Sequence, residues 1–469
     1  MPRAIILGGG ISGLSCAHYL IRKDSKLEVL LLEGLGRCGG TLGSERADGF
    51  VLERGPNGFL DDVPDAADLA RDLGLGERLL RASPQAKNRF IYSHGRLHAL
   101  PMGPVAFLRS KILGIGGRLR VLLEPFCGPG QGEDESVASF GRRRIGDEAT
   151  RAFLDPLVSG IFAGDVERLS LPSAFPKLAE MEARHGSLFR ALRMARRERS
   201  RHAPSEKGES ASTTPATTPA SSQRSLQSFS GGLEELVEAL TAEMGDRIRK
   251  NFAATSIARE GKGYAVVGNG GAREAGDALI LAVPAYRAAT LLAAPAPPLS
   301  LSLEAVPYAP IVVVCLGLPR ASVEHPLDGY GFLVPRDQGL RMLGTIWSST
   351  IFPPHAPAGM VSLRCIVGGA RDTDAIDGSD EALLKLVEEE LKPILGLRAP
   401  PTLTRIYRYA KGIPQYNVGH SKRLEAIERE LWSLPGLFLA GNAYRGVGIN
   451  DCVREARRKA RAVLEFLRR

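Results

Sequence analysis

Residues Arg3–Gly13, RAIILGGGISG, constrain the fold more than any other stretch. A short apolar run leads into a glycine turn with the spacing G-x-G-x-x-G, formed by Gly8, Gly10 and Gly13. In a βαβ unit the first glycine permits a tight turn, the second lets the backbone approach a pyrophosphate, and the third lets helix and strand pack closely. Ile11 and Ser12 would then open a helix whose N-terminus attracts phosphate. The stretch therefore predicts a dinucleotide-binding turn.

The next segments complete the βαβ pattern. Leu14–Lys23 places apolar residues on one helical face, and Lys26–Leu32 has the composition of a second strand. Glu33 follows that strand, twenty residues after Gly13, where such units place a carboxylate that accepts hydrogen bonds from ribose hydroxyls. Because strand, turn, helix, strand and acid occur in this order, we predict an α/β fold with a Rossmann-like nucleotide-binding domain.

Two further glycine motifs narrow the cofactor. Arg37, Gly39 and Gly40 form an R-x-G-G element, in which the glycines admit close backbone approach and the arginine can lie against phosphate or adenine. This element resembles one that follows the second strand in many flavoenzymes. Gly55 and Pro56 resemble the turn that lies under the flavin in the amine oxidase superfamily. The expected cofactor is therefore FAD rather than NAD.

The last residues of the chain have the same pattern of strand, glycine-rich loop and helix as the first. Gly436–Ala440 has the pattern of a strand, a glycine-rich loop follows, and Cys452–Leu467 has the pattern of a helix. A loop at a helix start binds anions, so we expect it to close the FAD site from the other side. The loop residues assigned to the cofactor are Gly441, Asn442, Val447, Gly448 and Ile449. The FAD-binding domain is then discontinuous.

Composition limits the remaining possibilities. The chain has 469 residues, no apolar run near the ~18 that cross a bilayer, and no expected secretory signal. Six cysteines without a C-x-x-C pair predict reduced thiols and no metal site. The net charge of +9 keeps acidic substrates and acidic membranes open as partners, and the sequence has no familiar nucleic-acid-binding motif.

Differences in local amino-acid composition along the chain predict its domains. Pro104–Phe126 mixes leucines and isoleucines with arginines and lysine, as in helices that lie in a membrane interface, although a basic helix that covers the core is the alternative. Ala203–Ser228, rich in Ser, Thr, Pro and Ala, predicts a flexible loop without chemistry. We therefore assign 1–84, 229–295 and 432–469 to the FAD-binding domain, 85–107 and 296–431 to an α+β substrate-binding domain, 108–202 to a helical membrane-binding domain, and 203–228 to the loop.

Taken together, the motifs resemble those of the protoporphyrinogen oxidase family, a branch of the amine oxidase-like flavoproteins. The matching segments cover nearly the whole chain except Ala203–Ser228: GGGISGL at Gly8–Leu14, NRFIY at Asn88–Tyr92, SGIFAGD at Ser159–Asp165, LDGYGFLVP at Leu327–Pro335, GIPQY at Gly412–Tyr416 and GNAYRGVGINDC at Gly441–Cys452. The resemblance implies oxidation of protoporphyrinogen IX to protoporphyrin IX, the penultimate step of haem biosynthesis, in three flavin cycles with O2 reduced to H2O2.

The same resemblance supplies the substrate-binding residues. Arg89 matches an arginine that faces a propionate, and Gly160 matches a glycine whose carbonyl faces the pyrrole N–H groups. Tyr330 takes the place of an aromatic residue that stacks on a pyrrole, and Leu333 and Ile366 match aliphatic positions on either side of the macrocycle. Tyr330 and Ile366 differ from the side chains of some members. The flavin N5 atom accepts the hydride, and no residue is assigned as acid or base.

Several alternatives remain. Some bacterial members oxidise coproporphyrinogen III by the same chemistry, and a flavin amine oxidase would share the dinucleotide motifs, as would a binding protein of this fold without flavin. The NRFIY and GYGFL segments favour the porphyrinogen reading, and Arg89 in its NRF context favours protoporphyrinogen. A quinone could replace O2. The resemblance also implies peripheral attachment to the cytoplasmic side of the inner membrane, and it leaves open a homodimer and hand-over of product to the next haem-pathway enzyme.

Overall fold

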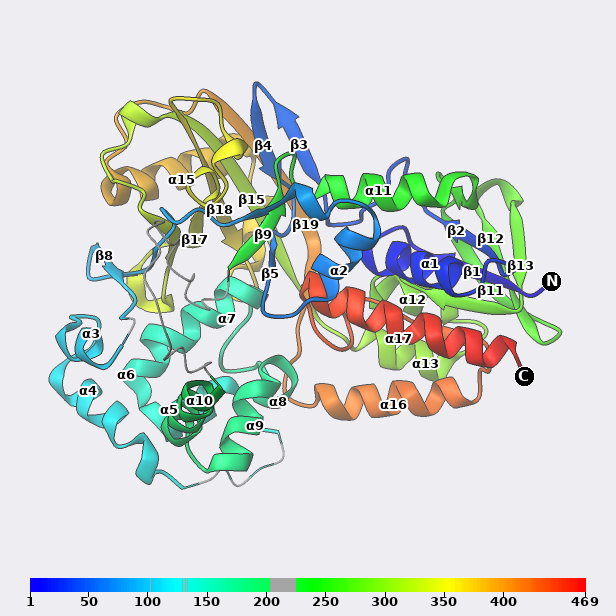
Figure 1. Ribbon diagram of the computed structural model, residues 1–469, viewed down its shortest axis with the longest axis horizontal. Coiled ribbons are helices and arrows are strands. Elements are labelled where there is room, and N and C mark those ends of the chain that lie inside the picture. Colours follow the sequence, from blue (N-terminus) through cyan, green and yellow to red (C-terminus); the bar gives the residue numbers. More distant parts are fainter. Residues whose placement is uncertain (102, 129, 131, 133, 203–224) are drawn as a thin grey trace, which may run out of the picture.

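Two β-sheets and a group of helices organise the chain, as Figure 1 shows. The computed structural model describes residues 1–101, 103–128, 130, 132, 134–202 and 225–469. One sheet and its helices form the right-hand half of Figure 1, the second sheet lies at the upper left, and the helical region lies below it. The termini lie close together at the far end of the first half.

The first sheet is the predicted nucleotide-binding sheet. All its pairings are parallel, and its strand order is β10-β2-β1-β14-β20. The strands are β1 (Arg3–Leu7), β2 (Glu28–Leu32), β10 (Ile248–Arg249), β14 (Ala278–Leu281) and β20 (Leu437–Leu439). They come from both ends and the middle of the chain. The Rossmann-like parallel sheet predicted from the glycine turn is thus confirmed.

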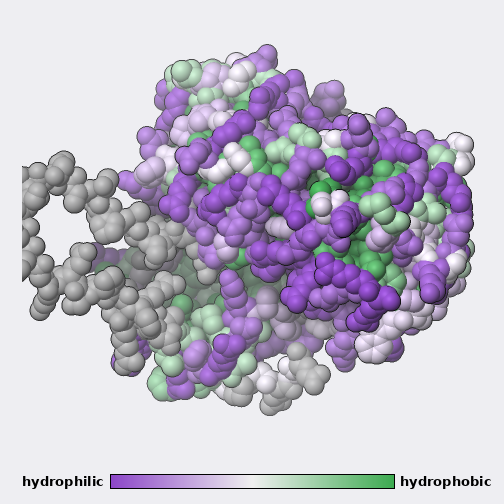
Figure 2. Space-filling view, turned by 45° about the vertical axis from the view of Figure 1, so that its right-hand side comes forward, coloured by the Kyte–Doolittle hydropathy of each residue, from purple (hydrophilic) through white to green (hydrophobic). Residues whose placement is uncertain are grey.

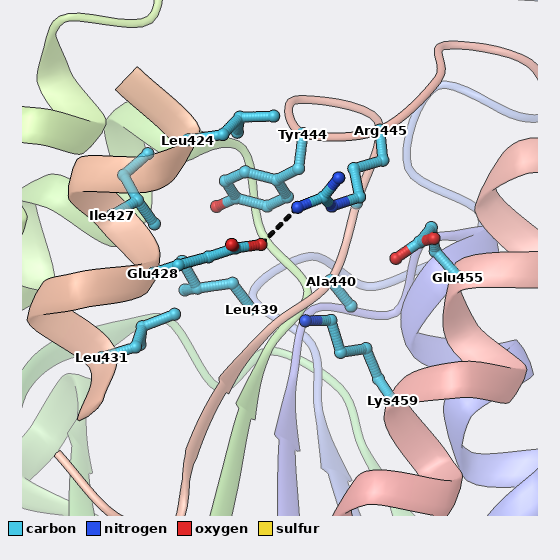
Figure 3. A pocket seen from close by; sticks show the side chains of 11 residues that line it. Leu424, Ile427, Glu428, Leu431, Leu439, Ala440, Tyr444, Arg445, Glu455 and Lys459 are labelled. Atoms are coloured by element: carbon cyan, nitrogen blue, oxygen red, sulfur yellow. Dashed lines mark hydrogen bonds and ion pairs between the residues drawn. The ribbon is translucent and has the colours of Figure 1, made fainter. Parts of the chain in front are cut away.

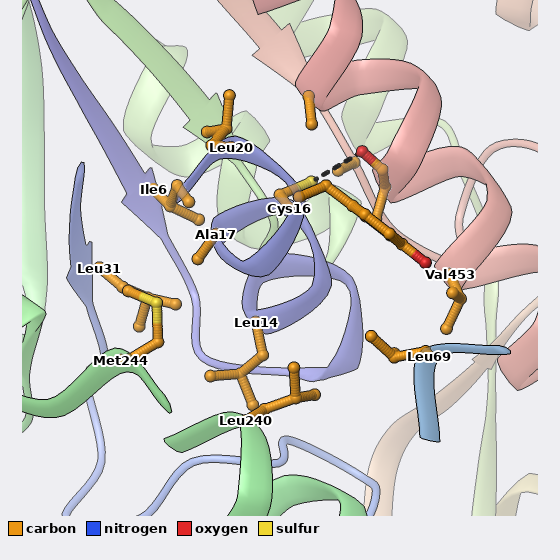
Figure 4. Close-up of a cluster of buried hydrophobic side chains, with 14 of the residues drawn as sticks. Ile6, Leu14, Cys16, Ala17, Leu20, Leu31, Leu69, Leu240, Met244 and Val453 are labelled. Atoms are coloured by element: carbon orange, nitrogen blue, oxygen red, sulfur yellow. Dashed lines mark hydrogen bonds between the residues drawn. The ribbon is translucent and has the colours of Figure 1, made fainter. Parts of the chain in front are cut away.

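Helices cover both faces of this sheet. One face packs on α1 (Ile11–Lys23), α2 (Asp65–Asp72), α11 (Glu234–Met244) and α17 (Ile449–Leu467). Figure 4 shows this cluster, in which Leu14 of α1 lies beside Leu240 of α11, and Val453 of α17 lies near Leu69 of α2. Full burial of each such side chain stabilises the fold by roughly 1.5–3 kcal/mol, so the two chain ends are held together by their shared core.

The opposite face corrects one predicted boundary. It packs on α12 (Ala285–Leu292), α13 (Pro297–Glu304) and α16 (His420–Trp432). From the sequence alone, 296–431 is expected to belong wholly to the substrate-binding domain. However, Leu299 and Leu303 of α13 and Ile427 of α16 are buried against the nucleotide-binding sheet. Both helices belong physically to that half because their apolar faces have their partners there.

The second sheet has seven strands in the order β19-β15-β18-β17-β16-β7-β8. They are β7 (Asn88–Ser93), β8 (Arg96–Ala99), β15 (Tyr308–Pro319), β16 (Gly329–Leu333), β17 (Met342–Trp347), β18 (Met360–Gly368) and β19 (Leu403–Pro414). Only the β7–β16 pairing is parallel. Helix α15 (Asp380–Leu395) covers one face, and the other face turns toward the nucleotide-binding half.

The helical region contains short helices packed around two small cores. Its elements are α3 (Pro104–Arg109), α4 (Ile115–Leu122), α5 (Val137–Ile145), α6 (Asp147–Ala149), α7 (Asp155–Phe162), α8 (Leu171–Ala174), α9 (Pro176–His185) and α10 (Leu188–His202). A π-helical turn, Thr150–Leu154, joins α6 to α7. Within the described ranges no helix is long and apolar enough to cross a membrane.

Small sheets and one short helix complete the fold. They are β3 (Ser44–Ala47) with β4 (Phe50–Glu53), β5 (Phe59–Leu60) and β6 (Leu79–Arg81) with β9 (Leu226–Phe229), β11 (Ala254–Glu260) with β12 (Gly263–Gly268) and β13 (Arg273–Gly276), and helix α14 (Ser348–Ile351).

Strand β9 corrects the predicted loop. Residues 203–224 lie outside the described ranges, whereas Gln227 and Ser228 are buried in a three-stranded sheet. The polar sequence of this stretch concealed the strand, since its pairing partners lie far away in sequence.

The surface agrees with the composition. Figure 2 shows one face on which hydrophilic residues predominate and hydrophobic ones gather mainly in recesses between them. The helical region departs from this pattern, because large apolar side chains of α3, α4 and α10 are exposed. Helices that face only water rarely expose so many apolar side chains in one region, so this part of the surface requires a separate explanation.

Candidate cofactor and substrate site

The first glycine turn has the geometry of a phosphate-binding turn. Gly8 has φ +108°, and a Cβ on it would lie 2.6 Å from the Ala282 carbonyl oxygen. A Cβ on Gly13 would lie 1.9 Å from the Gly8 carbonyl oxygen. At Gly10 a Cβ would meet no atom within 4 Å. Gly8 and Gly13 are thus demanded by the turn itself, whereas Gly10 faces open space at the start of α1, which is where a pyrophosphate would lie.

Glu33 is tied into the same turn. Its carboxylate accepts hydrogen bonds from the backbone N–H of Gly9 at 2.6 Å and of Leu35 at 2.8 Å. Its side chain is buried at the end of β2. An ionised carboxylate has about four acceptor positions, so these two bonds leave room for hydroxyl donors. Contact with ribose stays a prediction.

The R-x-G-G loop lies directly beside the turn. The N–H of Gly39 donates to the Gly9 carbonyl at 2.7 Å, and a Cβ on Gly40 would lie 3.4 Å from the Gly10 Cα. Arg37 folds back onto its own loop and donates to the carbonyl oxygen of Gly40 at 2.7 Å. Its guanidinium therefore shapes the loop, and its contact with phosphate or adenine stays a prediction.

Gly55 meets both the cofactor half and the second sheet. A Cβ on Gly55 would lie 2.0 Å from the Thr41 carbonyl oxygen, so the turn before Pro56 is pressed against the R-x-G-G loop. The buried guanidinium of Arg364, on β18, donates to the carbonyl oxygens of Gly55 and Glu53. Burial lowers the pKa of Arg364, and it raises the pKa of the nearby Glu53 carboxyl to about 7. No motif in the sequence indicated a role for Arg364.

The C-terminal loop leads into helix α17, which packs on α1. Helix α17 begins at Ile449 with Gly448 as its N-cap residue, and Ile449 is buried in the core beneath α1. Asn450 donates to the Leu60 carbonyl and accepts from the Ala66 N–H, which fixes the helix start. Val447 packs into the core of the helical region. Two helix N-termini, those of α1 and α17, therefore stand on neighbouring packed helices.

These features fit a dinucleotide. The fold brings the turn at Gly10, the loop at Gly40 and the acid Glu33 into direct contact, and the open position at Gly10 is the cradle that a side chain would fill. Free N–H groups at a helix start are suited to phosphate oxygens. The small pocket in Figure 3, about 30 Å³, is a separate feature behind the C-terminal loop and could hold only about one water molecule.

The expected substrate residues share one face of the second sheet. Leu333 pairs with Gly344, and Gly344 pairs with Ile366, so the two aliphatic side chains flank a glycine across three strands. Gly160, on α7, lies over this row, since a Cβ on it would be 2.9 Å from Leu333 Cδ2. The fold thus brings Gly160 together with the partly exposed apolar side chains of Leu333 and Ile366.

Arg89 and Tyr330 lie farther along the same sheet. The Arg89 guanidinium stands 4.3 Å from the centre of the Tyr330 ring. Arg89 is exposed and forms no ion pair with a carboxylate among the residues that the structure describes. Stacking uses the flat face of the guanidinium and leaves its N–H edge available for a carboxylate. An anion at this ring would therefore find a charged partner already in place.

The sequence reasoning missed the residues that hold α7 in place. Asp155, fully buried at the start of α7, accepts from Arg336 at 2.9–3.2 Å and from Arg371 at 3.1–3.2 Å. Arg336 also reaches Asp165 at 2.8 Å. A buried carboxylate needs such partners to remain charged. The network fixes Gly160 relative to the sheet, and its members are too far apart in sequence for any local pattern to reveal it.

Comparison with known proteins agrees with this geometry. The sequence pattern described as flavin containing amine oxidoreductase matches residues 11–464. The chain is 31% identical to coproporphyrinogen III oxidase of Bacillus subtilis, over 99% of this chain and 98% of the relative. It is 34% identical to protoporphyrinogen oxidase of Bos taurus, over 98% of each. The solved structure of a provisionally assigned protoporphyrinogen oxidase from Exiguobacterium sp. 255-15 matches with a TM-score of 0.83 at 29% identity, over 99% of each chain. The chain thus belongs to the flavin-containing amine oxidoreductase family, and the cofactor of its dinucleotide site is FAD.

Proposed function

We propose that the protein oxidises protoporphyrinogen IX to protoporphyrin IX. The observation that carries the proposal is the Arg89–Tyr330 pair, at 4.3 Å, at the end of an apolar surface formed by Leu333, Ile366 and Gly160. A flat macrocycle with propionates along one edge needs both an apolar surface and a cation at its end. Relatives named as oxidases of two porphyrinogens support this substrate class.

The chemistry balances over three turnovers. The porphyrinogen loses six electrons and six protons, and three O2 molecules become three H2O2. FAD, when bound, supplies the acceptor for a hydride in each turnover. The hydride leaves a bridging carbon between two pyrroles, where aromatic conjugation develops as it departs. O2 is the acceptor that we propose, and a quinone is the alternative.

The chain's own residues bind and orient the ring. Arg89 would hold a propionate through its N–H edge while the flat face of its guanidinium stays stacked on Tyr330. Leu333 and Ile366 would contact the macrocycle, and the Gly160 carbonyl would face the pyrrole N–H groups. Holding the ring in one orientation lowers the entropic part of the barrier. We assign no side chain as a proton acceptor.

Coproporphyrinogen III is the second candidate substrate. The relative from Bacillus subtilis, 31% identical over 99% of this chain, is a coproporphyrinogen III oxidase. That substrate carries four propionates in place of two. Tyr330, the ring partner of Arg89, packs against an apolar cluster that includes Ile346 and Phe352, and such surroundings suit vinyl and methyl groups better than two further carboxylates. This balance of charge favours protoporphyrinogen.

Porphyrin fluorescence provides the test. The purified holoenzyme should oxidise protoporphyrinogen IX with a higher kcat/KM than coproporphyrinogen III, with flavin reduction followed in parallel. The reverse order would assign the protein to coproporphyrinogen III. If amines bleached the flavin under anaerobic conditions and neither porphyrinogen did, the protein would instead be an amine oxidase.

We further infer that the helical region binds a membrane surface. An apolar–basic surface combines large exposed side chains with cations: Val105, Leu108, Ile115, Leu119, Leu122, Leu123, Phe126, Phe189, Leu192 and Met194, with Arg109, Lys111 and Arg193. Helices of this composition bind anionic lipid interfaces through buried apolar area and charge. We propose peripheral attachment, on the cytoplasmic side of the inner membrane, which suits a poorly soluble macrocyclic product.

A further inference from the structure

A single hydroxyl group joins both ends of the loop that forms one wall of the FAD site. The Tyr416 hydroxyl donates to the Asn442 carbonyl at 2.6 Å and accepts from the Gly446 N–H at 2.8 Å. Tyr416 is 1% exposed. Both loop groups are therefore satisfied by one side chain that lies outside the dinucleotide motifs. A buried backbone group that loses its partner costs more than an exposed one, so this contact controls the shape of the loop.

His420 holds the middle of the same loop. Its ring stacks on Tyr416 with centroids 4.1 Å apart and planes at 14°, and its Nε2 lies 3.1 Å from the Tyr444 carbonyl oxygen. Burial lowers the pKa of His420 to about 4, so the neutral ring donates through Nε2 near neutral pH. Figure 3 shows that the loop is also joined to α16, through the ion pair between Arg445 of the loop and Glu428.

Tyr416 contacts the substrate side as well. Its ring centroid lies 5.7 Å from that of Phe162, the last residue of α7, which also carries Gly160. The backbone around it is bonded to the segment before α8, since the Ser170 N–H donates to the Tyr416 carbonyl at 2.8 Å. One buried ring is thus packed against the helix over the substrate surface and hydrogen-bonded to the loop over the cofactor.

We propose that Tyr416, supported by His420, is a positioning residue that sets the FAD-binding loop Gly441–Gly448 relative to helix α7. A fixed distance between these two walls fixes where the flavin lies relative to the macrocycle, and small displacements of reacting groups cost rate steeply. The inference rests on FAD as the cofactor and is independent of which porphyrinogen is the substrate. Its test therefore uses the flavin itself.

The decisive variant is Tyr416→Phe in the holoenzyme. It keeps the stacked ring and removes only the hydroxyl. Release of flavin, followed by its fluorescence after dilution, should become roughly 25-fold faster, because two hydrogen bonds of the loop are lost and each contributes a factor of about five. The visible absorption bands of the bound flavin should shift, and kcat should fall more than KM changes.

Tyr264→Phe is the matched control. The Tyr264 hydroxyl also donates to a backbone carbonyl, that of Pro435 at 3.2 Å, but within the described residues it forms no hydrogen bond with the loop Gly441–Gly448. It should leave flavin release and spectrum unchanged. If Tyr416→Phe matched this control in flavin release and spectrum, and lowered only the Tm of the apoprotein, the positioning role would be refuted.

A second variant covers the case in which Tyr416→Phe does not fold. His420→Phe keeps the stacking and removes the donor to the Tyr444 carbonyl. It should accelerate flavin release in the same direction and by a smaller factor, about fivefold, since one hydrogen bond is lost. Release at the wild-type rate would show that the hydrogen bond from His420 does not control the loop, and the proposed support of Tyr416 by His420 would be refuted.

Discussion

Gly160 of α7 and Leu333 of β16 face each other so closely that a methyl group on Gly160 would lie 2.9 Å from Leu333 Cδ2. The atom in the way is the end of a flexible side chain, so Gly160→Ala should fold. Leu333 would move into the space over the sheet and narrow the substrate surface. We expect KM for protoporphyrinogen to rise roughly fivefold or more, the typical scale of overpacking, with flavin content unchanged. Steady-state kinetics with porphyrin fluorescence measures this.

A second substitution tests whether the rise in KM comes from the displaced Leu333 side chain or from a general disturbance of the fold. Leu333→Val shortens the side chain that Gly160→Ala would displace, so the double variant should recover much of the lost affinity. Coupling between neighbouring sites of this kind is commonly about 0.5–3 kcal/mol. If the two single effects were simply additive, Gly160 and Leu333 would not bound the same substrate surface.

Arg89 provides the charge at the end of that surface. Arg89→Ala removes a charge-assisted contact to a propionate, which should weaken substrate binding by about 1–3 kcal/mol and appear in KM. Arg89→Lys keeps the charge without the planar N–H edge, so its KM should lie between those of wild type and Arg89→Ala. Arg259→Ala, an exposed arginine on β11, is the control for net charge. Unchanged kinetics for Arg89→Ala would remove Arg89 from the site.

The local part of the cofactor site was predictable from sequence. Gly8, Gly13 and Glu33 act within one βαβ unit, so their spacing alone specified the turn, the helix start and the acid, and the structure has all three in contact. Arg37 shows the limit of such reasoning. Its position in the R-x-G-G motif was evident, but its side chain turns onto the carbonyl groups of its own loop, a choice that depends on packing.

Contacts between distant segments were not predictable in this way. Asp155 meets Arg336 and Arg371 from segments more than 150 residues away. Tyr416 was noted only within the GIPQY motif, and nothing in that motif indicated that its hydroxyl binds the loop before α17. The same applies to α16, whose partner sheet is formed mostly by much earlier strands. The resemblance could supply the substrate residues because family motifs record such contacts indirectly.

Gly10 and Gly13 should respond differently to the same substitution. Gly10 has an extended backbone, φ −72° and ψ 175°, and faces open space, so Gly10→Ala should leave the Tm of the apoprotein unchanged while its methyl obstructs the pyrophosphate. Gly13→Ala places a methyl 1.9 Å from a carbonyl oxygen and should destabilise the apoprotein itself. Thermal unfolding and FAD titration of both variants test this. An equal loss of stability in Gly10→Ala and Gly13→Ala would contradict the proposal that Gly10 faces the open space for the pyrophosphate.

Glu53 predicts a pH dependence of stability. Burial raises the pKa of its carboxyl to about 7, above that of an unfolded glutamate, so the folded state keeps the proton longer. The free energy of unfolding should therefore fall as pH rises from about 4.5 to about 7, by up to about 3 kcal/mol, and then level off. Glu53→Gln should remove this component, which urea unfolding at several pH values would reveal.

The control for that experiment is Glu260→Gln. Glu260 is exposed and bonded to Arg273, which lowers the pKa of its carboxyl. The variant should keep the decline between about pH 4.5 and pH 7 that Glu53→Gln loses. An identical pH profile for wild type and Glu53→Gln would mean that Glu53 is ionised in the fold throughout this range.

The apolar–basic surface of the helical region predicts lipid binding that depends on particular side chains. Ile115 and Phe126 are 74% and 82% exposed, so replacing both with glutamate should leave folding intact and remove apolar area from the interface. Sedimentation with anionic vesicles should fall at least about tenfold, because glutamates also repel the lipid charge. Leu301→Glu, at a leucine 68% exposed on α13, is the matched control and should sediment like wild type. Equal sedimentation of all three proteins would place the membrane contact elsewhere or exclude it.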